Sequence, residues 1–205
     1  MRVILRLTAL MLCLFALGAG VAQAQGAPPP PPPPQQQQQQ QQQHRKTFSA
    51  REIIGQGHKF FGTVSQGLAQ VVQEAFSRFG EPNGYVLGQE GGGAFVVGVR
   101  YGDGKLYTRN AGDLRVFWEG PSIGFDAGGE GARTMMLVYN LPATDAIYQR
   151  FGGIDGSAYF IGGFGMTALT YNKIVVVPIR SGVGFRLGAN VGYLKFTPRA
   201  TWNPF

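Results

Sequence analysis

A chain of 205 residues, 44% of them hydrophobic, is long enough to form one domain with a buried core. The formal charge of +7 comes from 18 basic and 11 acidic residues, and the arginines are scattered rather than gathered in the basic stripe of a nucleic-acid-binding protein. Cys13 is the single cysteine, which excludes an internal disulfide and argues against a cysteine-based metal site.

The first 24 residues have the features of a secretory signal peptide. Two arginines near the start precede an apolar run over Leu7–Ala19, and Ala22 and Ala24 provide the small residues of a cleavage site. We therefore expect cleavage between Ala24 and Gln25, export by the Sec route to the periplasm, and a mature chain without cysteine. An uncleaved membrane anchor is the alternative, although the apolar run is short for a span.

Residues 25–47 form a linker of low complexity. Pro28–Pro34 are seven consecutive prolines, and Gln35–Gln43 are nine consecutive glutamines. Neither tract can bury enough apolar area to offset the entropy of folding, so we expect a disordered segment. The prolines should form an extended spacer of roughly 22 Å, at about 3.1 Å per residue. Whether the tract is a functional spacer or a repeat without a role is left open.

Two segments with helical spacing open the domain that we expect over residues 48–205. Ser49 and Glu52 have the spacing of a capping box, which marks a helix start. From Thr63 to Phe79, apolar residues recur with the period of an amphipathic helix, which Gly80 ends. We expect this N-terminal helical segment to cover one end or one face of a sheet. A membrane-surface helix is the alternative.

The rest of the chain alternates short apolar segments with glycine-rich breaks, which predicts about nine or ten short strands. We interpret Gly91–Gly93 as a break between two strands and Asp103–Gly104 as a two-residue hairpin turn. A second hairpin is predicted at Asn172–Lys173. One short helix is expected among the strands, over Pro142–Phe151, because proline suits a first helical turn and Gly152 ends it.

The clearest strand pattern lies near the end of the chain. Apolar residues alternate mostly with glycine from Gly182 to Phe196, in the stretch SGVGFRLGANVGYLKF that begins at Ser181. One face of such a strand is apolar and the other is mostly bare backbone, which suits a coiled sheet or the close approach of a backbone or ligand. Together the segments predict a mainly β fold, a small soluble antiparallel β-barrel of about eight to ten strands.

Two long segments carry a family resemblance in the order of their glycines and aromatic residues. They are GDLRVFWEGPSIGFDAGGEGARTMMLVYN and FGGIDGSAYFIGGFGMTALTYNKIVVVPIRSGVGFRLGANVGYLKFTPRATWNPF. They resemble the envelope integrity protein A (EipA) family of alphaproteobacteria, and the resemblance extends over the whole domain from about Thr47. It implies an exported periplasmic protein with a small β-barrel that maintains the cell envelope. The family offers no established catalytic residues to carry over to this chain.

A fainter similarity is to the SYLF lipid-binding domain. It is carried by a glycine-spaced segment over Ile123–Gly131, a short apolar strand over Met135–Asn140 and glycine-alternating strands over Gly153–Gly165. This similarity implies contact with a lipid surface, although the basic membrane-binding patch of that domain has no clear counterpart in this sequence.

Few residue patterns point to catalysis or metal binding. His44 and His58 are separated by thirteen other residues without metal-ligand spacing, and a Gly-x-Ser-x-Gly motif is absent. Asp126 and Glu130 flank three small residues and could hold a hard cation or act as acid and base on a glycan, but a turn with two solvated acids is the more common arrangement. We therefore expect no enzyme activity, no metal and no cofactor.

Six residues are the candidates for binding a ligand. Four of them are arginines in strand-like segments, Arg100, Arg115, Arg180 and Arg186. Each should point outward or pair with a carboxylate, because an unpaired buried guanidinium is very costly. If several converge inside the barrel, they would form an anion-binding pocket. Trp118 and Tyr193 are candidates for lining the barrel interior or its mouth, with core filling as the alternative.

We therefore expect a non-enzymatic envelope protein that binds an envelope lipid, glycan or protein partner and no nucleic acid, with peripheral membrane contact left open. An outer-membrane β-barrel is one alternative, because the chain ends in Phe205. Against it, Pro198 and Pro204 interrupt the last segment, and the expected strands are shorter than the 9–11 residues that span a bilayer. A hydrolase of envelope polymers is the other alternative.

Overall fold

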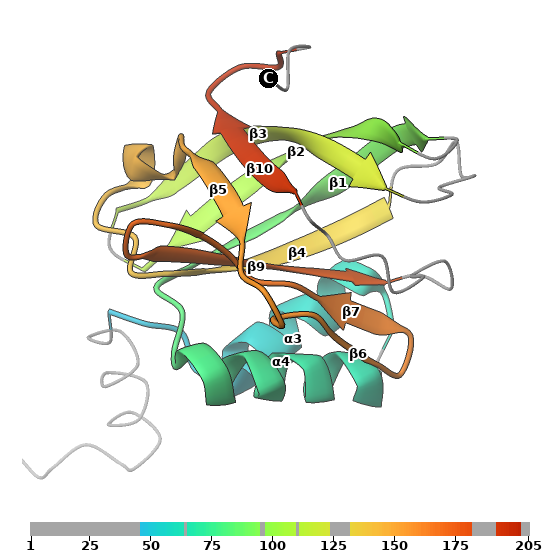
Figure 1. Ribbon diagram of the computed structural model, residues 1–205. Helices are drawn as coiled ribbons and strands as arrows, with labels where there is room; N and C mark the ends of the chain where they lie inside the picture. The colour runs from blue at the N-terminus through green and yellow to red at the C-terminus, as the bar shows by residue number, and fades with distance from the viewer. Residues whose placement is uncertain are drawn as a thin grey trace, which may run out of the picture. The chain divides into compact units, whose positions relative to one another are not determined.

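The computed structural model describes residues 46–63, 65–94, 97–109, 111–123, 132–181 and 192–201. The predicted signal peptide, the Pro/Gln tracts and residues 182–191 of the glycine-alternating segment therefore lie outside the described residues. The described part contains two α-helices followed by ten strands of one sheet (Figure 1). None of its helices combines the length and the apolar character needed to cross a membrane.

Both predicted helices are present, and each begins at a serine cap. In α3 (Ala50–Phe61), the Ser49 hydroxyl accepts a hydrogen bond from the Glu52 backbone N–H at 3.4 Å. The Glu52 carboxylate in turn accepts one from the Ser49 N–H at 2.9 Å, which completes the capping box. In α4 (Gln66–Phe79), Ser65 accepts from the Leu68 N–H at 3.4 Å. Local sequence chemistry therefore fixes where each helix starts.

The ten strands pair antiparallel throughout, and eight of them close into a barrel. Around the barrel the order is β4, β1, β2, β3, β10, β5, β8 and β9, and β9 pairs back onto β4. The remaining strands, β7 and β6, extend from the far half of β9 as a flap. The predicted antiparallel barrel of eight to ten strands is confirmed. The strand bounds are β1 (Gly84–Ala94), β2 (Val97–Thr108), β3 (Asp113–Ile123), β4 (Ala132–Tyr139), β5 (Arg150–Gly153), β6 (Tyr159–Ile161), β7 (Phe164–Met166), β8 (Leu169–Tyr171), β9 (Ile174–Ser181) and β10 (Tyr193–Thr197).

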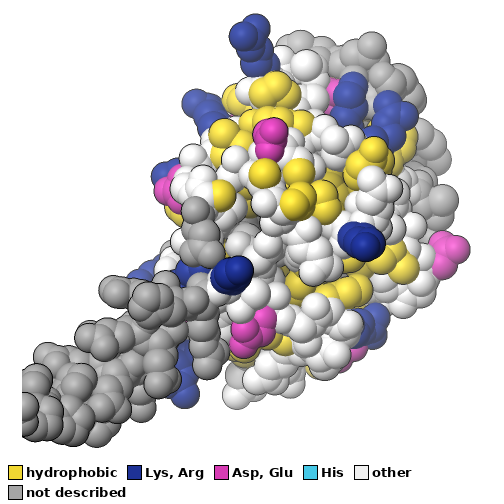
Figure 2. All heavy atoms as spheres, turned by 90° about the vertical axis from the view of Figure 1, so that its left-hand side faces the viewer, with side chains coloured by type: hydrophobic (Ala, Val, Ile, Leu, Met, Phe, Trp, Pro, Cys, Tyr) yellow, Lys and Arg dark blue, Asp and Glu magenta, His cyan; other side chains and the backbone are white. Residues whose placement is uncertain are grey.

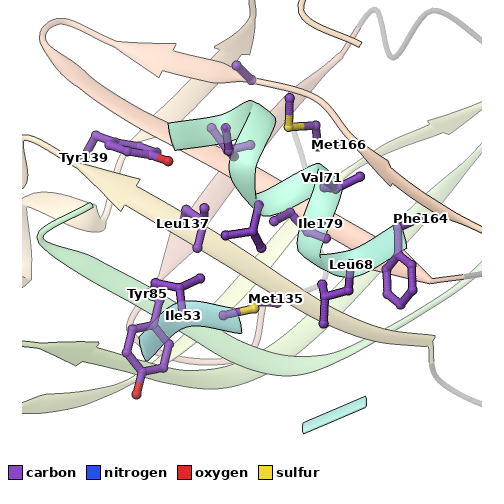
Figure 3. Close-up of a cluster of buried hydrophobic side chains, with 14 residues drawn as sticks. Ile53, Leu68, Val71, Tyr85, Met135, Leu137, Tyr139, Phe164, Met166 and Ile179 are labelled. Carbon is purple, nitrogen blue, oxygen red and sulfur yellow. The ribbon is translucent and has the colours of Figure 1, made fainter. Parts of the chain in front are cut away.

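The barrel wall separates two apolar cores. The two helices pack on its outer face, where Leu68 of α4 and Leu137 of β4 belong to one cluster of buried side chains; we call this the helix-facing core (Figure 3). The alternate residues of β4, Met136 and Val138, point inward and belong to a second cluster, the interior core. Because β4 is buried on both faces, six consecutive residues from Thr134 to Tyr139 are buried.

The predicted hairpin turn at Asp103–Gly104 is wrong, and so is the strand break at Gly91–Gly93. β1 runs unbroken through the glycines, and Asp103 and Gly104 lie inside β2, opposite Gln89 and Gly88. A Cβ added to Gly104 would lie 2.8 Å from the Cα of Gly88. Glycine is therefore needed for close approach of two backbones rather than for a turn.

The inserted helix is present, but it is shorter than the predicted Pro142–Phe151. Only Thr144–Ile147 are helical, as one 3₁₀ turn, η2. The chain then enters β5, where Phe151 is fully buried in the interior core and pairs with Leu194 of β10. Tertiary burial of this aromatic side chain overrides the local helix signal. The predicted hairpin at Asn172–Lys173 is confirmed, since it joins β8 to β9.

Candidate functional site

Two of the four predicted arginines point into the barrel. Arg100 of β2 and Arg180 of β9 share the inward face with apolar residues of their own strands, such as Leu106 and Val176. Arg115 of β3 lies on the outer face and is strongly exposed, while Arg186 lies outside the described residues. The structure thus brings together one pair of the predicted set.

Both inward arginines converge on Glu90 of β1, a residue that the sequence reasoning missed. Arg180 donates to the same carboxylate oxygen of Glu90, Oε2, from Nη2 at 3.1 Å and from Nε at 3.3 Å. The Nη1 of Arg100 lies 3.7 Å from the other oxygen, Oε1. All three side chains are at least nine-tenths buried. They form a buried ion triad with two positive charges and one negative charge.

Trp118 of β3 completes the triad from inside the barrel. Its indole Nε1 donates to the Oε2 of Glu90 at 3.2 Å, and the residue is 1% exposed. The ring lies over the bare backbone of two neighbouring strands, because a Cβ at Gly102 would overlap the indole and one at Gly88 would lie 2.6 Å from its Cη2 atom. These inward glycines make the space that a large aromatic ring needs.

The electrostatics of the triad hold Glu90 ionised. Burial by itself raises the pKa of the Glu90 carboxyl, because a charged group is less stable away from water. The nearby guanidiniums of Arg180 and Arg100, with the hydrogen bonds from Arg180 and Trp118, outweigh burial and hold this pKa below its usual value of 4.5. At neutral pH the Glu90 carboxylate is therefore an acceptor and has no proton to give.

Thr134 of β4 adds a polar group without a hydrogen-bond partner. It is fully buried, points inward with Met136, and lies directly opposite Arg180 in the β4–β9 pairing. Its hydroxyl oxygen has no hydrogen-bond partner among the residues that the structure describes. We call Glu90, Arg100, Trp118, Thr134 and Arg180 the Glu90 cluster. A buried hydroxyl left without a bond costs about 1–3 kcal/mol.

The Glu90 cluster lies near one end of the barrel. At this end β1, β3 and β9 finish, and β2, β4 and β10 begin, so we call it the β1–β2 end. Glu90, Arg100 and Arg180 all stand within a few residues of these strand termini, whereas core residues such as Val86, Leu106 and Val138 stand near the opposite ends of their strands. The cluster is therefore the polar layer above an apolar layer.

The other predicted site residues lie away from the cluster. Arg115 pairs with Asp103 at 3.3 Å on the outer surface and stacks over Phe117. Tyr193 alternates with the inward Leu194 and faces outward, where the guanidinium of Arg150 lies over its ring at 4.4 Å. The pairings thus place Trp118 inside the barrel and Tyr193 outside it.

A second candidate is a small cavity at the opposite end of the barrel. Its volume is about 90 Å³, and its lining includes Lys46, Asn83, Thr108 and Arg109. The guanidinium of Arg109 is already engaged by the carboxylate of Glu52. Lys and Arg side chains on this side of the domain are spread singly rather than gathered (Figure 2). We therefore take the Glu90 cluster, whose charged side chains are at least nine-tenths buried, as the stronger candidate.

One signal in the sequence could have found Glu90. It has the same parity as Val86 and Gly88, so an unbroken β1 would place it on the inward face with them. The predicted break at the adjacent glycines hid this parity. Thr134 had no such signal, because its significance comes from the pairing partner Arg180, 46 positions later in the chain.

Comparison with known proteins agrees with this barrel. A solved structure, described as a β-barrel-like, uncharacterised protein from Brucella abortus, is 55% identical, with a TM-score of 0.74, and the match covers 78% of this chain and all of that one. The comparison with curated proteins found no match. The fainter similarity to the SYLF domain stays a prediction. The family model described as envelope integrity protein A matches residues 46–205, and the chain therefore belongs to that family.

Proposed function

We propose that this chain is an exported, non-enzymatic protein of the periplasm that maintains the cell envelope by binding an anionic envelope component at the β1–β2 end of its barrel. The envelope setting rests on membership of the family and on the signal-like segment before Gln25. The binding role rests on the Glu90 cluster.

The observation that carries the proposal is the pair of guanidiniums buried against a single carboxylate. Burying charged groups removes their hydration, and a buried ion triad often stabilises a fold less than apolar residues of the same volume would. The interior core a few residues away is fully apolar, so the barrel can be packed without charges. Each guanidinium has five N–H donors and can bond to more acceptor oxygens than the two that Glu90 supplies, which favours an anion as the ligand.

The ionisation state of the Glu90 carboxyl group supports a binding role over a catalytic one. A general acid must carry a proton near the working pH, but the two guanidiniums keep this carboxylate ionised. Its oxygens orient Arg180 and accept from Trp118 instead of facing a substrate. The acid pair considered for a hydrolase, Asp126 and Glu130, lies outside the described residues.

The distribution of apolar residues favours a periplasmic barrel over one in the outer membrane. Membrane barrels have a polar interior and an apolar outer band. Here the interior holds residues such as Phe151 and Val176, and the outer face of β4 is covered by α3 and α4. The helix-covered part of the wall has no surface left for lipid.

The proposal is tested by what the exported protein carries. The full-length chain is expressed so that it is exported, released by osmotic shock and analysed by native mass spectrometry. We expect a mass starting at Gln25 and a bound anionic envelope molecule, which Arg180→Gln loses. The matched control, Arg115→Gln, removes an arginine from the outer face and should keep the ligand.

Two results would contradict the proposal. One is a wild-type protein that carries no anionic molecule when it is purified from its own envelope. The other is equal ligand loading in the wild type and in Arg180→Gln, because the cluster would then take no part in binding.

A further inference from the structure

We propose that Thr134 and Arg180 together bind an oxyanion of the ligand, a group that phosphodiesters and carboxylates share. This inference rests on the proposed function and names both the chemistry that is recognised and a residue, Thr134, that recognises it. The guanidinium of Arg180 supplies a positive charge and N–H donors, and the neighbouring hydroxyl of Thr134 supplies a further donor.

The pairing of β4 with β9 brings the two side chains together. Thr134 and Arg180 are direct partners in the antiparallel register, and both point into the barrel. Directly opposite residues on one face of such a pair have Cβ atoms about 4.5–5.5 Å apart. One oxyanion can therefore accept hydrogen bonds from both side chains.

Arg180 is held with one edge of its guanidinium free for a ligand. Nε and Nη2 face Glu90, whereas Nη1 hydrogen-bonds to no residue that the structure describes. Because Glu90 fixes the orientation of the guanidinium, little side-chain freedom is lost when an anion binds. Glu90 is thus a positioning residue, and Arg180 is the binding residue.

Thr134 is the independent observation that points to a ligand. Its hydroxyl is fully buried, has no hydrogen-bond partner among the described residues, and stands beside a cation. The hydroxyl of Tyr139 is also buried without a partner, but it lies in the apolar helix-facing core, where burial raises the pKa of the phenol. An anion would satisfy Thr134, which stands opposite Arg180, whereas the described residues that form the cluster around Tyr139 are apolar.

The chemistry of the ligand group follows from the donors that Arg180 and Thr134 offer. The guanidinium of Arg180 is a charged donor that favours an anionic oxygen, and the Thr134 hydroxyl is a neutral donor beside it. Phosphodiesters and carboxylates each carry a negative charge and at least two acceptor oxygens, which match these two donors.

The test uses small probes and the indole of Trp118 as a reporter. Trp118 hydrogen-bonds to Glu90, so its indole N–H resonance should shift when an anion binds beside the cluster. The exported full chain is titrated with diethyl phosphate, methyl glucuronate and the neutral methyl glucoside. The chain has two tryptophans, so the indole resonance that remains in the Trp202→Phe variant is assigned to Trp118. We expect saturable shifts with at least one of the two anions and none with the neutral sugar.

Variants then separate a binding hydroxyl from a structural one. Thr134→Val removes the unpartnered hydroxyl and should raise Tm by about 2–4 °C, while affinity for the anion falls about tenfold to a hundredfold. Thr134→Ser keeps a hydroxyl and should retain most of the affinity. Tyr139→Phe is the matched control, because it removes the other partnerless hydroxyl and should leave binding unchanged.

The titrations and the variants test the class of ligand, the role of Thr134 and the proposed function separately. Shifts with diethyl phosphate alone identify a phosphodiester source, and shifts with methyl glucuronate alone identify an acidic glycan. If Thr134→Val binds as tightly as the wild type while Arg180→Gln does not, the assignment of Thr134 is overturned and the proposed function survives. If neither anion shifts the wild-type resonance, the oxyanion proposal is overturned, whereas the proposed function is judged separately by the co-purified ligand.

Discussion

The two ends of the barrel interior differ in polarity: one is packed with apolar side chains, and the other holds buried charges. At one end the interior core packs side chains such as Leu106 and Val138, and each large side chain that leaves water there stabilises the fold by about 1.5–3 kcal/mol. At the β1–β2 end the same wall holds Glu90 between two guanidiniums, where the loss of hydration offsets much of the attraction. The fold is therefore held by one end, and the other is suited to recognition.

Removing the carboxylate from the charged end should have the largest effect. Glu90→Gln leaves two buried guanidiniums facing each other without an anion, so we expect the free energy of unfolding to fall by about 3–5 kcal/mol in urea denaturation. Asp103→Asn, which breaks the exposed pair with Arg115, is the control and should cost less than about 1 kcal/mol. Equal stability of Glu90→Gln and the wild type would show that the triad is already solvated.

Truncation in the apolar helix-facing core should cost slightly less. Leu68→Ala removes a fully buried side chain between α4 and the barrel, and we expect a loss of about 3 kcal/mol by the same measurement. Gln70→Ala, on the exposed face of α4, should change stability by less than about 0.5 kcal/mol. If the two variants were alike, the helices would not be packed on the wall as described.

The glycines beneath Trp118 allow a smaller test at the boundary of the two ends. Gly102→Ala places a methyl group against the indole and should cost about 1–3 kcal/mol, with a changed Trp118 indole resonance. Gly91→Ala has open space around its Cβ and serves as the matched control. A tolerated Gly102→Ala with an unchanged indole resonance would contradict the position of the ring.

Acid should weaken the charged end selectively. The folded state holds the pKa of Glu90 below 4.5, so the stabilisation that this group provides is fully present above pH 4.5 and is lost as the pH falls through the lower, folded value. Urea midpoints measured from pH 7 to pH 3 should therefore fall less steeply on the acid side in Glu90→Gln than in the wild type. Parallel profiles for the two proteins would rule out a lowered pKa at this residue.

The features of the fold that could be predicted from the sequence are those that depend on residues close together in the chain. The capping box of Ser49 and Glu52 and the turn at Asn172–Lys173 depend on residues within a few positions, and both were predicted. The role of Gly104 was not, because it depends on a neighbouring strand that packs too closely for a side chain. An apparent turn dipeptide therefore became part of a strand.

Only part of the candidate site could be predicted, because the rest depends on contacts between residues that are distant in the chain. Strand-like context pointed to Arg100 and Arg180, but their meeting point depends on how eight strands close into a barrel. Glu90 lies 90 positions from Arg180 in the chain, and only the closed register brings them together. Thr134 became visible only through its partner across β4 and β9.

The central claim is that the charges of the Glu90 cluster serve recognition rather than stability. The direct measurement is detergent resistance of a strain whose only copy of the gene carries Glu90→Leu, Arg100→Met and Arg180→Met together, with secretion of the folded protein checked alongside. We predict a barrel at least as stable as the wild type, because apolar residues replace the whole triad, and an envelope as sensitive as that of a strain without the gene. Full detergent resistance from this variant would contradict the account.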